Sequence, residues 1–232
     1  MTFVLVHGGG FDGRCWESLV PLLDGDVLAV DLPGRNGDPS VTVDDFADAV
    51  VAAIVERDWT DVTLVGHSLA GITLPRVAGL IPERLRQLIF VSASVPPEGV
   101  SVLDVLGTLS PTVREVAAQI GDAVVDERGV LHPDFAAAMF CNDMDDATKA
   151  WTLARMTPEV MGVIATPMTL AGLGTIPRTY VRLLQDESVS LDAQNQMIAA
   201  LEPCTVADLD AGHMAMISAP THLAPLLNRL CH

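Results

Sequence analysis

The sequence predicts an α/β fold in which a mostly parallel sheet of about six strands is flanked by helices and interrupted by a helical insert. Short apolar runs alternate with helical patterns over the first ninety or so residues and again near the C-terminus. Runs such as Val62–Val65 and Leu88–Val91 are apolar on both faces, as buried parallel strands are. Polar motifs follow several of these runs, which places a candidate site at one edge of the sheet.

The elements are expected in the following order. Strands are predicted in the apolar runs Thr2–Val6, Asp26–Asp31, Asp61–Val65, Gln87–Ser92, Arg178–Leu184 and Cys204–Asp208. Helices of the core are predicted where apolar residues recur at helical spacing, at Arg14–Leu23, Val43–Arg57, Leu69–Leu80, Leu191–Leu201 and Pro220–Leu230. The turn-rich segment 31–39 is typical of a loop at the strand-end face.

The alternation breaks after residue 93. Residues 94–177 hold helical patterns without a clear strand, at Thr112–Gln119, Pro133–Phe140, Asp145–Ala154 and Pro158–Val163. We therefore expect one domain over residues 1–232, with a core of 1–93 and 178–232 and a helical cap of 94–177. Methionine and aromatic residues in this insert suit an adaptable apolar pocket, although packing of the cap onto the core would also explain them.

Composition and charge limit the classes of partner. The chain of 232 residues is 50% hydrophobic and has a formal net charge of -17, from 30 acidic and 13 basic residues. Such a surface repels nucleic acid and anionic membranes, so we expect neither as a partner. A polyanionic substrate is also disfavoured, whereas a homodimer is compatible with the apolar residues of the insert.

The remaining composition indicates a cytoplasmic protein without a cofactor. The four cysteines, at positions 15, 141, 204 and 231, match no zinc or redox spacing and are expected to be reduced thiols. No secretory segment and no continuous apolar stretch of membrane-spanning length is evident. We expect no metal site, because the histidines are scattered, and His132, His222 and His232 are assigned as surface or structural residues.

The stretch Gly66–Ala70 reads Gly-His-Ser-Leu-Ala and lies between an apolar run and a helical pattern. A serine between small residues at a strand-to-helix junction is typical of a nucleophile elbow, because the two backbones crowd there. The motif usually ends in glycine, whereas here Ala70 takes that place and Gly71 follows. Ser68 is therefore a candidate nucleophile, and a buried serine that caps an ordinary helix is the alternative.

A glycine-rich loop, His7-Gly8-Gly9-Gly10, follows the first expected strand. A nucleophilic serine needs N–H donors aimed at the oxyanion of its tetrahedral intermediate. One donor normally belongs to the residue after the nucleophile, here Leu69, and the other to a loop of this kind. We expect Gly9 to supply the second donor and His7 to be a structural residue bonded to loop backbone; a plain strand-to-helix turn is the alternative for the loop.

Two further polar motifs follow strands expected in the second half of the chain. The run Tyr180–Leu184 leads to Asp186, and the strand before residue 209 leads to the loop that contains His213. With Ser68, these residues give the chain order Ser, Asp, His, each at the end of a strand. That order is the one found in α/β-hydrolases, in which all three groups meet at the carboxyl edge of one parallel sheet.

The expected roles follow from the chemistry of these three groups. Ser68 attacks a carbonyl, His213 takes its proton and passes it to the leaving group, and Asp186 holds the imidazole tautomer. Asp208 and Asp210 are rivals of Asp186, but they lie close to His213 in sequence and precede its loop instead of ending a separate strand.

Four motifs together resemble the plant methylesterase and hydroxynitrile lyase group of α/β-hydrolases and its bacterial esterase relatives. They are Phe3-Val-Leu-Val-His-Gly8, Gly66-His-Ser-Leu-Ala-Gly71, Leu184-Gln-Asp186 and Gly212-His-Met-Ala-Met-Ile217. The resemblance covers essentially the whole chain and is weakest in the insert. It implies a catalytic triad of Ser68, Asp186 and His213, with Gly9 and Leu69 as oxyanion donors.

The resemblance also bears on which of the two chemistries of this group applies. The lyases carry a lysine directly after the catalytic histidine and a threonine directly after the histidine of the first loop. This sequence has Met214 and Gly8 at those places, which departs from the lyases and fits the esterases. We expect Gly8 and Met214, with Met139 and Trp151 of the insert, to line the substrate pocket.

The sequence therefore predicts a serine hydrolase that cleaves small, neutral, fairly apolar carboxylic esters through an acyl-enzyme. Three alternatives stay open at this point: carbon–carbon lyase chemistry on a cyanohydrin, hydrolysis of lactones or amides by the same residues, and a weakly catalytic small-molecule binding protein of the same fold.

Overall fold

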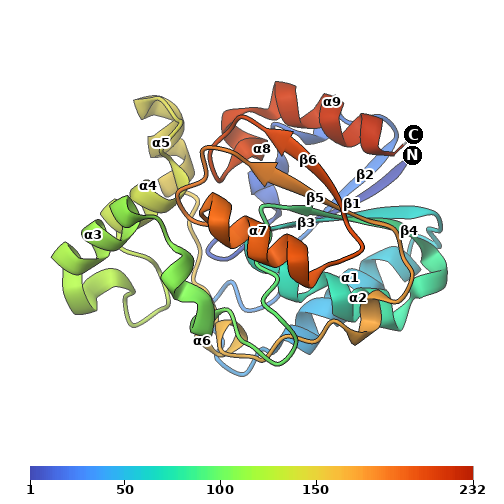
Figure 1. Cartoon of the computed structure of the whole chain (residues 1–232), viewed down its shortest axis with the longest axis horizontal. Helices are drawn as coiled ribbons and strands as arrows, with labels where there is room; N and C mark the ends of the chain where they lie inside the picture. The colour runs from blue at the N-terminus through green and yellow to red at the C-terminus, as the bar shows by residue number, and fades with distance from the viewer. Residues whose placement is uncertain (232) are drawn as a thin grey trace.

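A six-stranded, all-parallel sheet forms the centre of the computed structural model, which describes residues 1–231 (Figure 1). The strands lie in the order β2-β1-β3-β4-β5-β6. They span Thr2–Val6 (β1), Asp26–Val30 (β2), Val62–His67 (β3), Leu85–Val91 (β4), Arg178–Leu183 (β5) and Thr205–Leu209 (β6). The predicted parallel sheet of about six strands is confirmed. Because β2 and β3 lie on opposite sides of β1, the strand order reverses there, and ligands bind at the carboxyl ends of strands beside such a reversal.

Each face of the sheet has its own hydrophobic core, because alternate strand residues point to opposite sides. Val4 and Val6 of β1 join the core beneath α1 (Val43–Val55), α2 (Leu74–Leu80) and α7 (Leu191–Ala200). Phe3 and Leu5 join the core beneath α8 (Ala215–Ser218) and α9 (Pro220–Leu230). The side chains of β3 are buried over its whole length, as its apolar sequence predicts.

Two predicted helices are broken in the structure, and proline explains both. The segment 14–23 forms two short 3-10 helices, Gly13–Trp16 (η1) and Val20–Leu22 (η2), instead of one α-helix. Pro21 lies within the second of them and cannot donate the hydrogen bond of an α-helix interior. The segment 69–80 divides into a 3-10 helix, Ser68–Ile72 (η3), and α2, which begins with Pro75 in its first turn.

A long insert, which we define as residues 92–177, connects β4 to β5. Its elements are η5 (Leu103–Thr108), α3 (Pro111–Ile120), η6 (Gly121–Val124), α4 (Pro133–Phe140), α5 (Asp146–Leu153), α6 (Met161–Ile164) and η7 (Ala171–Leu173). Figure 1 shows α3, α4 and α5, in green to yellow, standing together beside the sheet at the end where β5 and β6 finish. The insert therefore lies where the loops after the strands carry their polar motifs.

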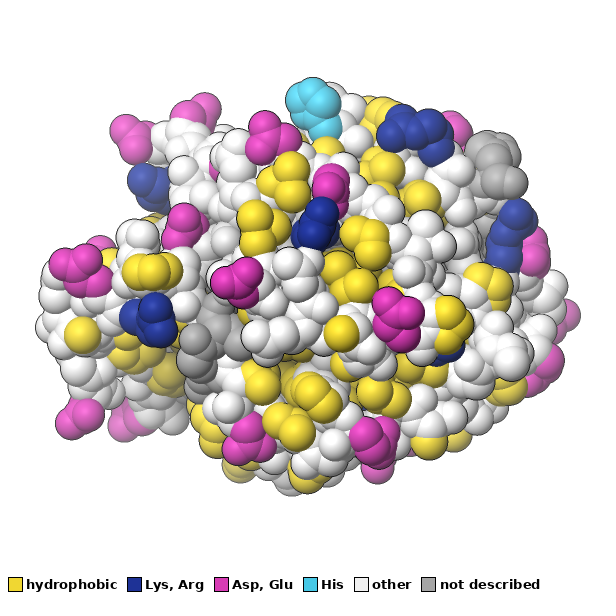
Figure 2. Space-filling view, in the orientation of Figure 1, with side chains coloured by type: hydrophobic (Ala, Val, Ile, Leu, Met, Phe, Trp, Pro, Cys, Tyr) yellow, Lys and Arg dark blue, Asp and Glu magenta, His cyan; other side chains and the backbone are white. Residues whose placement is uncertain are grey.

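Acidic side chains are scattered over the face shown in Figure 2 and do not gather in one patch. None of the described helices, over residues 1–231, is long and apolar enough to cross a membrane. His232, which the sequence assigns as a surface or structural residue, lies outside the described residues.

Candidate active site

The turn that follows β3 places Ser68 in a strained backbone conformation. Its φ of +51° lies in the left-handed region, which is unfavourable for a residue with a side chain. A Cβ added at Gly66 would lie 2.5 Å from Leu74 Cδ1, and one added at Gly71 would overlap the carbonyl oxygen of Ser94. The tight positions of this turn are therefore Gly66 and Gly71, which is why Ala70 can take the place of the usual glycine.

The structure brings Ser68, His213 and Asp186 together from the loops after β3, β6 and β5. His213 Nε2 lies 3.0 Å from Ser68 Oγ, and His213 Nδ1 lies 2.6 Å from Asp186 Oδ2. The side chains of His213 and Asp186 are fully buried. Because a carboxylate only accepts hydrogen bonds, Nδ1 carries the proton, and Nε2 is left to accept one from the Ser68 hydroxyl.

Asp186 is held by three further donors. Its Oδ2 accepts a hydrogen bond from the Ser92 hydroxyl at 2.6 Å, and its Oδ1 accepts from the N–H groups of Ser188 and Val189 at 2.7 and 2.8 Å. With His213, these donors hold both oxygens of the carboxylate in place. The rivals lie elsewhere: Asp208 pairs with Arg182, and Asp210 accepts a hydrogen bond from Gln185.

A second histidine supports the loop of the first. His67 Nε2 donates a hydrogen bond to the backbone oxygen of His213 at 2.8 Å, and the two rings lie 4.5 Å apart. Burial holds the pKa of His67 well below 6.5, so its ring stays uncharged beside His213. On another side, the ring of Phe140 stacks on His213 with 5.6 Å between centroids. These contacts fix the plane of the His213 imidazole.

The glycine-rich loop after β1 is fastened at two points. His7 Nδ1–H donates to the oxygen of Gly8, and His7 Nε2 accepts from the Leu32 N–H at 3.1 Å. Burial lowers the pKa of His7 to about 4, which keeps it neutral in this structural position. The N–H of Gly10 donates to Glu159 Oε2 at 3.0 Å, and a Cβ on Gly9 would lie 2.9 Å from the same oxygen.

Glu159, a residue that the sequence motifs do not single out, forms a nearly buried ion pair with Arg35. Arg35 donates to Oε1 at 2.6 Å and to Oε2 at 2.9 Å, and the Val160 N–H donates to Oε1 at 2.8 Å. The two side chains are 12% and 7% exposed, so little solvent screens the pair. Arg35 is 124 positions away in sequence, and no local pattern could have indicated the contact.

Two neighbouring residues of the insert hold the loops of His213 and Asp186. Asp143 Oδ2 accepts hydrogen bonds from the Gly212 N–H at 2.6 Å and from the Ser218 hydroxyl at 2.7 Å. Asn142 Nδ2 donates to the oxygen of Gln185 at 2.7 Å. The insert is therefore tied directly to the segments that carry the candidate catalytic residues.

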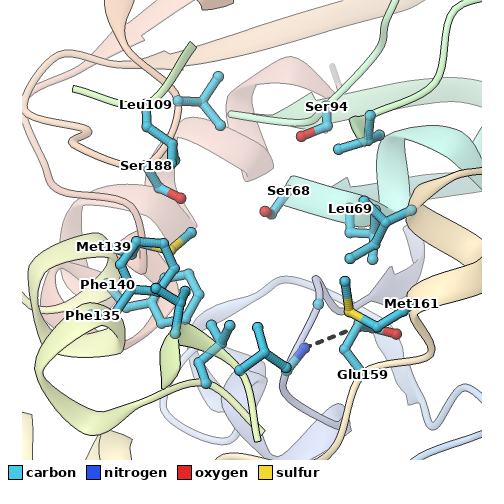
Figure 3. A pocket seen from close by; sticks show the side chains of 18 of the residues that line it. Ser68, Leu69, Ser94, Leu109, Phe135, Met139, Phe140, Glu159, Met161 and Ser188 are labelled. Atoms are coloured by element: carbon cyan, nitrogen blue, oxygen red, sulfur yellow. Dashed lines mark hydrogen bonds between the residues drawn. The ribbon is translucent and has the colours of Figure 1, made fainter. Parts of the chain in front are cut away.

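A cavity of about 230 Å³ opens between Ser68 and the insert (Figure 3). Gly9 and Leu69 line it beside Ser68. Apolar side chains form most of the rest, among them Leu131, Phe135, Met139, Phe140 and Met161. Its polar side chains are Ser68, Ser94, Glu159 and Ser188.

Three residues expected in the pocket lie outside the lining of this cavity, whereas Met139 lies in it. Met214 is 1% exposed and packs into the core under α8 and α9. Trp151 instead stacks under the guanidinium of Arg155, whose Cζ is 3.6 Å from the ring centroid. Gly8 lies behind Ser68, where an added Cβ would approach the Ser68 Cβ to 2.8 Å.

Among residues 1–231, no group of three or more His, Cys, Asp or Glu side chains is placed to hold a metal ion. The four cysteines are free thiols. Cys141 directly follows Phe140, which lines the cavity. Burial raises the pKa of the Cys141 thiol to about 11, so this thiol is protonated at neutral pH.

Comparison with known proteins identifies the family of the chain. The profile of the Alpha/beta hydrolase family matches residues 3–224. The chain belongs to this family. Methylesterase 9 of Arabidopsis thaliana is 27% identical over 98% of this chain and 97% of its own length. The carbendazim hydrolyzing esterase of Nocardioides sp. (strain SG-4G) is 29% identical over 99% of both chains. The crystal structure of a pyrethroid hydrolase from Sphingobium faniae JZ-2 superimposes with a TM-score of 0.77 at 26% identity, covering 100% of this chain and 97% of the other.

Proposed function

We propose that the protein is a serine esterase in which Ser68 is the nucleophile, His213 the general base and Asp186 the residue that orients His213. The observation that carries this proposal is the hydrogen-bonded chain Ser68–His213–Asp186 at the wall of an apolar cavity. Gly9 and Leu69, which flank Ser68 in that cavity, are proposed to donate their N–H groups to the oxyanion.

The proposed reaction runs through an acyl-enzyme. Ser68 Oγ attacks the ester carbonyl while His213 Nε2 takes its proton, and the carbonyl oxygen becomes an oxyanion. His213 then gives the proton to the departing alcohol, which leaves the acyl group bonded to Ser68. A water molecule then gives a proton to His213 and attacks the acyl carbonyl. The bond to Ser68 Oγ breaks, His213 returns the proton to that oxygen, and the carboxylic acid is released. Asp186 stabilises the imidazolium that forms in both steps.

The reaction class is confirmed by the relatives, which are named methylesterases, a carbendazim hydrolyzing esterase and a pyrethroid hydrolase. Within that class, the cavity supports a small, neutral, largely apolar substrate. Its lining is mostly apolar, and both oxygens of its one carboxylate, Glu159, are already bonded to Arg35 and backbone N–H groups. The acidic surface, with its net charge of -17, adds to the preference for neutral esters.

We further propose that the insert acts as the cap of the active site. Phe135, Met139 and Phe140 of α4 supply part of the cavity wall, and Asn142 and Asp143 bind the loops of Asp186 and His213. A segment with these contacts determines the shape of the acyl or alcohol pocket and also the position of the catalytic groups.

Lyase chemistry has less support from the site. Met214, which takes the place of the lyase lysine, is buried in the apolar core and provides no positive charge for a departing cyanide. At Gly8, a threonine side chain would begin with a Cβ only 2.8 Å from that of Ser68. Both observations favour ester hydrolysis over lyase chemistry.

The proposal is tested by hydrolysis of p-nitrophenyl butyrate. Ser68→Ala is expected to lower kcat by at least about a thousandfold, on the scale seen when a triad member is removed. Ser40→Ala, which changes an exposed serine that does not line the cavity, serves as the matched control and should retain activity. Turnover by Ser68→Ala close to that of the wild type would refute the assignment of the nucleophile. Release of cyanide from mandelonitrile by the wild type, but not by Ser68→Ala, would favour the lyase.

A further inference from the structure

Two serine hydroxyls of the cavity are not used by the proposed mechanism. Of the four polar side chains that line it, Ser68 is engaged by His213, and Glu159 is engaged by Arg35 and by backbone N–H groups. The other two are Ser94 and Ser188, and neither hydroxyl has a hydrogen-bond partner among the residues that the structure describes. Figure 3 shows both hydroxyls turned toward the interior of the cavity, on either side of Ser68.

The backbone of Ser94 is fixed by the nucleophile turn itself. Its N–H donates to the carbonyl oxygen of Ser68 at 2.8 Å, and its backbone lies so close to Gly71 that a Cβ there would reach within 3.0 Å of the Ser94 nitrogen. The position of the Ser94 hydroxyl relative to Ser68 is thus determined by the same contacts that shape the elbow.

The backbone of Ser188 is fixed by the residue that orients His213. Its N–H donates to Asp186 Oδ1 at 2.7 Å, and the next residue, Val189, makes a second such bond. Ser188 is only 5% exposed, so its hydroxyl has the cavity as its main open direction. A few rigidly placed polar groups in an apolar pocket are what fixes ligand orientation and specificity.

We infer that Ser94 and Ser188 form a polar subsite in two parts, one on either side of Ser68, and that each part binds a neutral hydroxyl or carbonyl substituent of the substrate, close to the scissile ester group. This inference rests on the proposed esterase function. A serine hydroxyl both donates and accepts, so a hydroxyl or carbonyl group satisfies it, and an apolar group in the same place leaves it unpaired. A carboxylate is disfavoured because no arginine or lysine lines the cavity within the part of the chain that the structure describes, and Arg35, which bonds to the cavity residue Glu159, is already paired with it.

Three esters of similar size test the subsite and locate the substituent. Ethyl butyrate is the reference, ethyl 2-hydroxybutyrate carries a hydroxyl on the acyl side, and 2-hydroxyethyl butyrate carries one on the alcohol side. Values of kcat/KM are measured by titration of the released acid for the wild type, Ser94→Ala, Ser188→Ala and the double variant. The intrinsic reactivity of each ester is the same with every protein, so it cancels when the ratio of hydroxy ester to ethyl butyrate is compared between proteins.

We expect this ratio to fall about three- to tenfold in each single variant for the hydroxy ester whose hydroxyl that serine contacts, on the scale of one hydrogen bond. The ester that responds in each variant identifies the side of the substituent that this serine binds, and Ser40→Ala should leave both ratios unchanged. Ratios that are equal in all proteins would overturn the subsite while the esterase function stands. If the folded wild type hydrolyses none of the three esters, the proposed function fails and the subsite fails with it.

Discussion

At the scale of single residues, two histidines next to the proposed triad are kept uncharged. Burial lowers the pKa of His7 to about 4 and holds that of His67 well below 6.5. Protonation of His7 would also remove the lone pair that accepts the Leu32 N–H. A histidine whose pKa is depressed in the folded protein stabilises the fold above its unfolded pKa, and that stabilisation is lost as the pH falls.

This effect predicts the pH dependence of stability. Between pH 7.5 and pH 5 the unfolded state takes up a proton at His7 that the native state does not, which lowers the free energy of unfolding by about 2 kcal/mol. Urea unfolding of the wild type should show that loss in excess of the loss in His7→Asn, which cannot titrate there. The contribution of His67 is common to both proteins and cancels. Parallel pH dependences in the two proteins would mean that His7 titrates near its ordinary pKa.

The candidate catalytic residues could be predicted from the sequence, whereas the residues that hold them in place by hydrogen bonds could not. Ser68, Asp186 and His213 each follow a recognisable apolar strand, and the carboxyl ends of parallel strands meet at one edge. Ser92 and Glu159 bind the site across 94 and 149 positions of sequence, respectively. Such partners are determined by how distant loops pack, which leaves no periodic pattern in the chain.

At the scale of elements, the loop after β1 and the end of the insert form one electrostatic unit. The carboxylate of Glu159 lies beside Gly9 and Gly10, where the proposed reaction develops an oxyanion, and Arg35 balances its charge. An unbalanced carboxylate there would repel the oxyanion in a site with little solvent to screen it.

We therefore expect Arg35→Met to lower kcat for p-nitrophenyl butyrate at least tenfold, with a smaller change in KM. Glu159→Gln, added to Arg35→Met, removes the uncompensated charge and should restore part of the lost kcat, although the packing of Arg35 is still missing. Arg86→Met is the control, because it removes an exposed arginine at the N-terminal end of β4, whereas the site lies at the carboxyl ends of the strands. If the double variant is no faster than Arg35→Met, the pair acts through packing alone.

In the insert, the positions of helices could be predicted from the sequence, but the side chains that face the cavity could not. Its helices α3 (predicted 112–119) and α4 (predicted 133–140) were placed to within a residue or two, because their apolar spacing is local information. Which side chains face the cavity was not predictable: Met139 does, whereas Trp151 lies against Arg155. The rotation of a short helix depends on its neighbours, and those neighbours are distant in sequence.

At the scale of the whole molecule, acidic residues far outnumber basic ones. The formal net charge is -17, the single lysine is Lys149, and acidic groups are spread over the face shown in Figure 2. Arg35, which bonds to the cavity residue Glu159, is neutralised by that contact. An anionic substrate therefore meets a repulsive field on approach and finds no free cation among the described residues that line the cavity.

This field predicts discrimination by charge. Monomethyl succinate and methyl butyrate have the same scissile group, but the first carries a carboxylate at neutral pH. At low ionic strength its kcat/KM should be lower than that of methyl butyrate by at least about tenfold, because repulsion across the surface and the cavity adds to the cost of desolvating the carboxylate. Salt at about 0.5 M screens the long-range part of that repulsion and should raise kcat/KM for the anionic ester several-fold while leaving the neutral ester nearly unchanged. Equal salt responses of the two esters would show that the net charge does not act on substrate binding, and a preference for the anionic ester would require a cation that reaches the cavity.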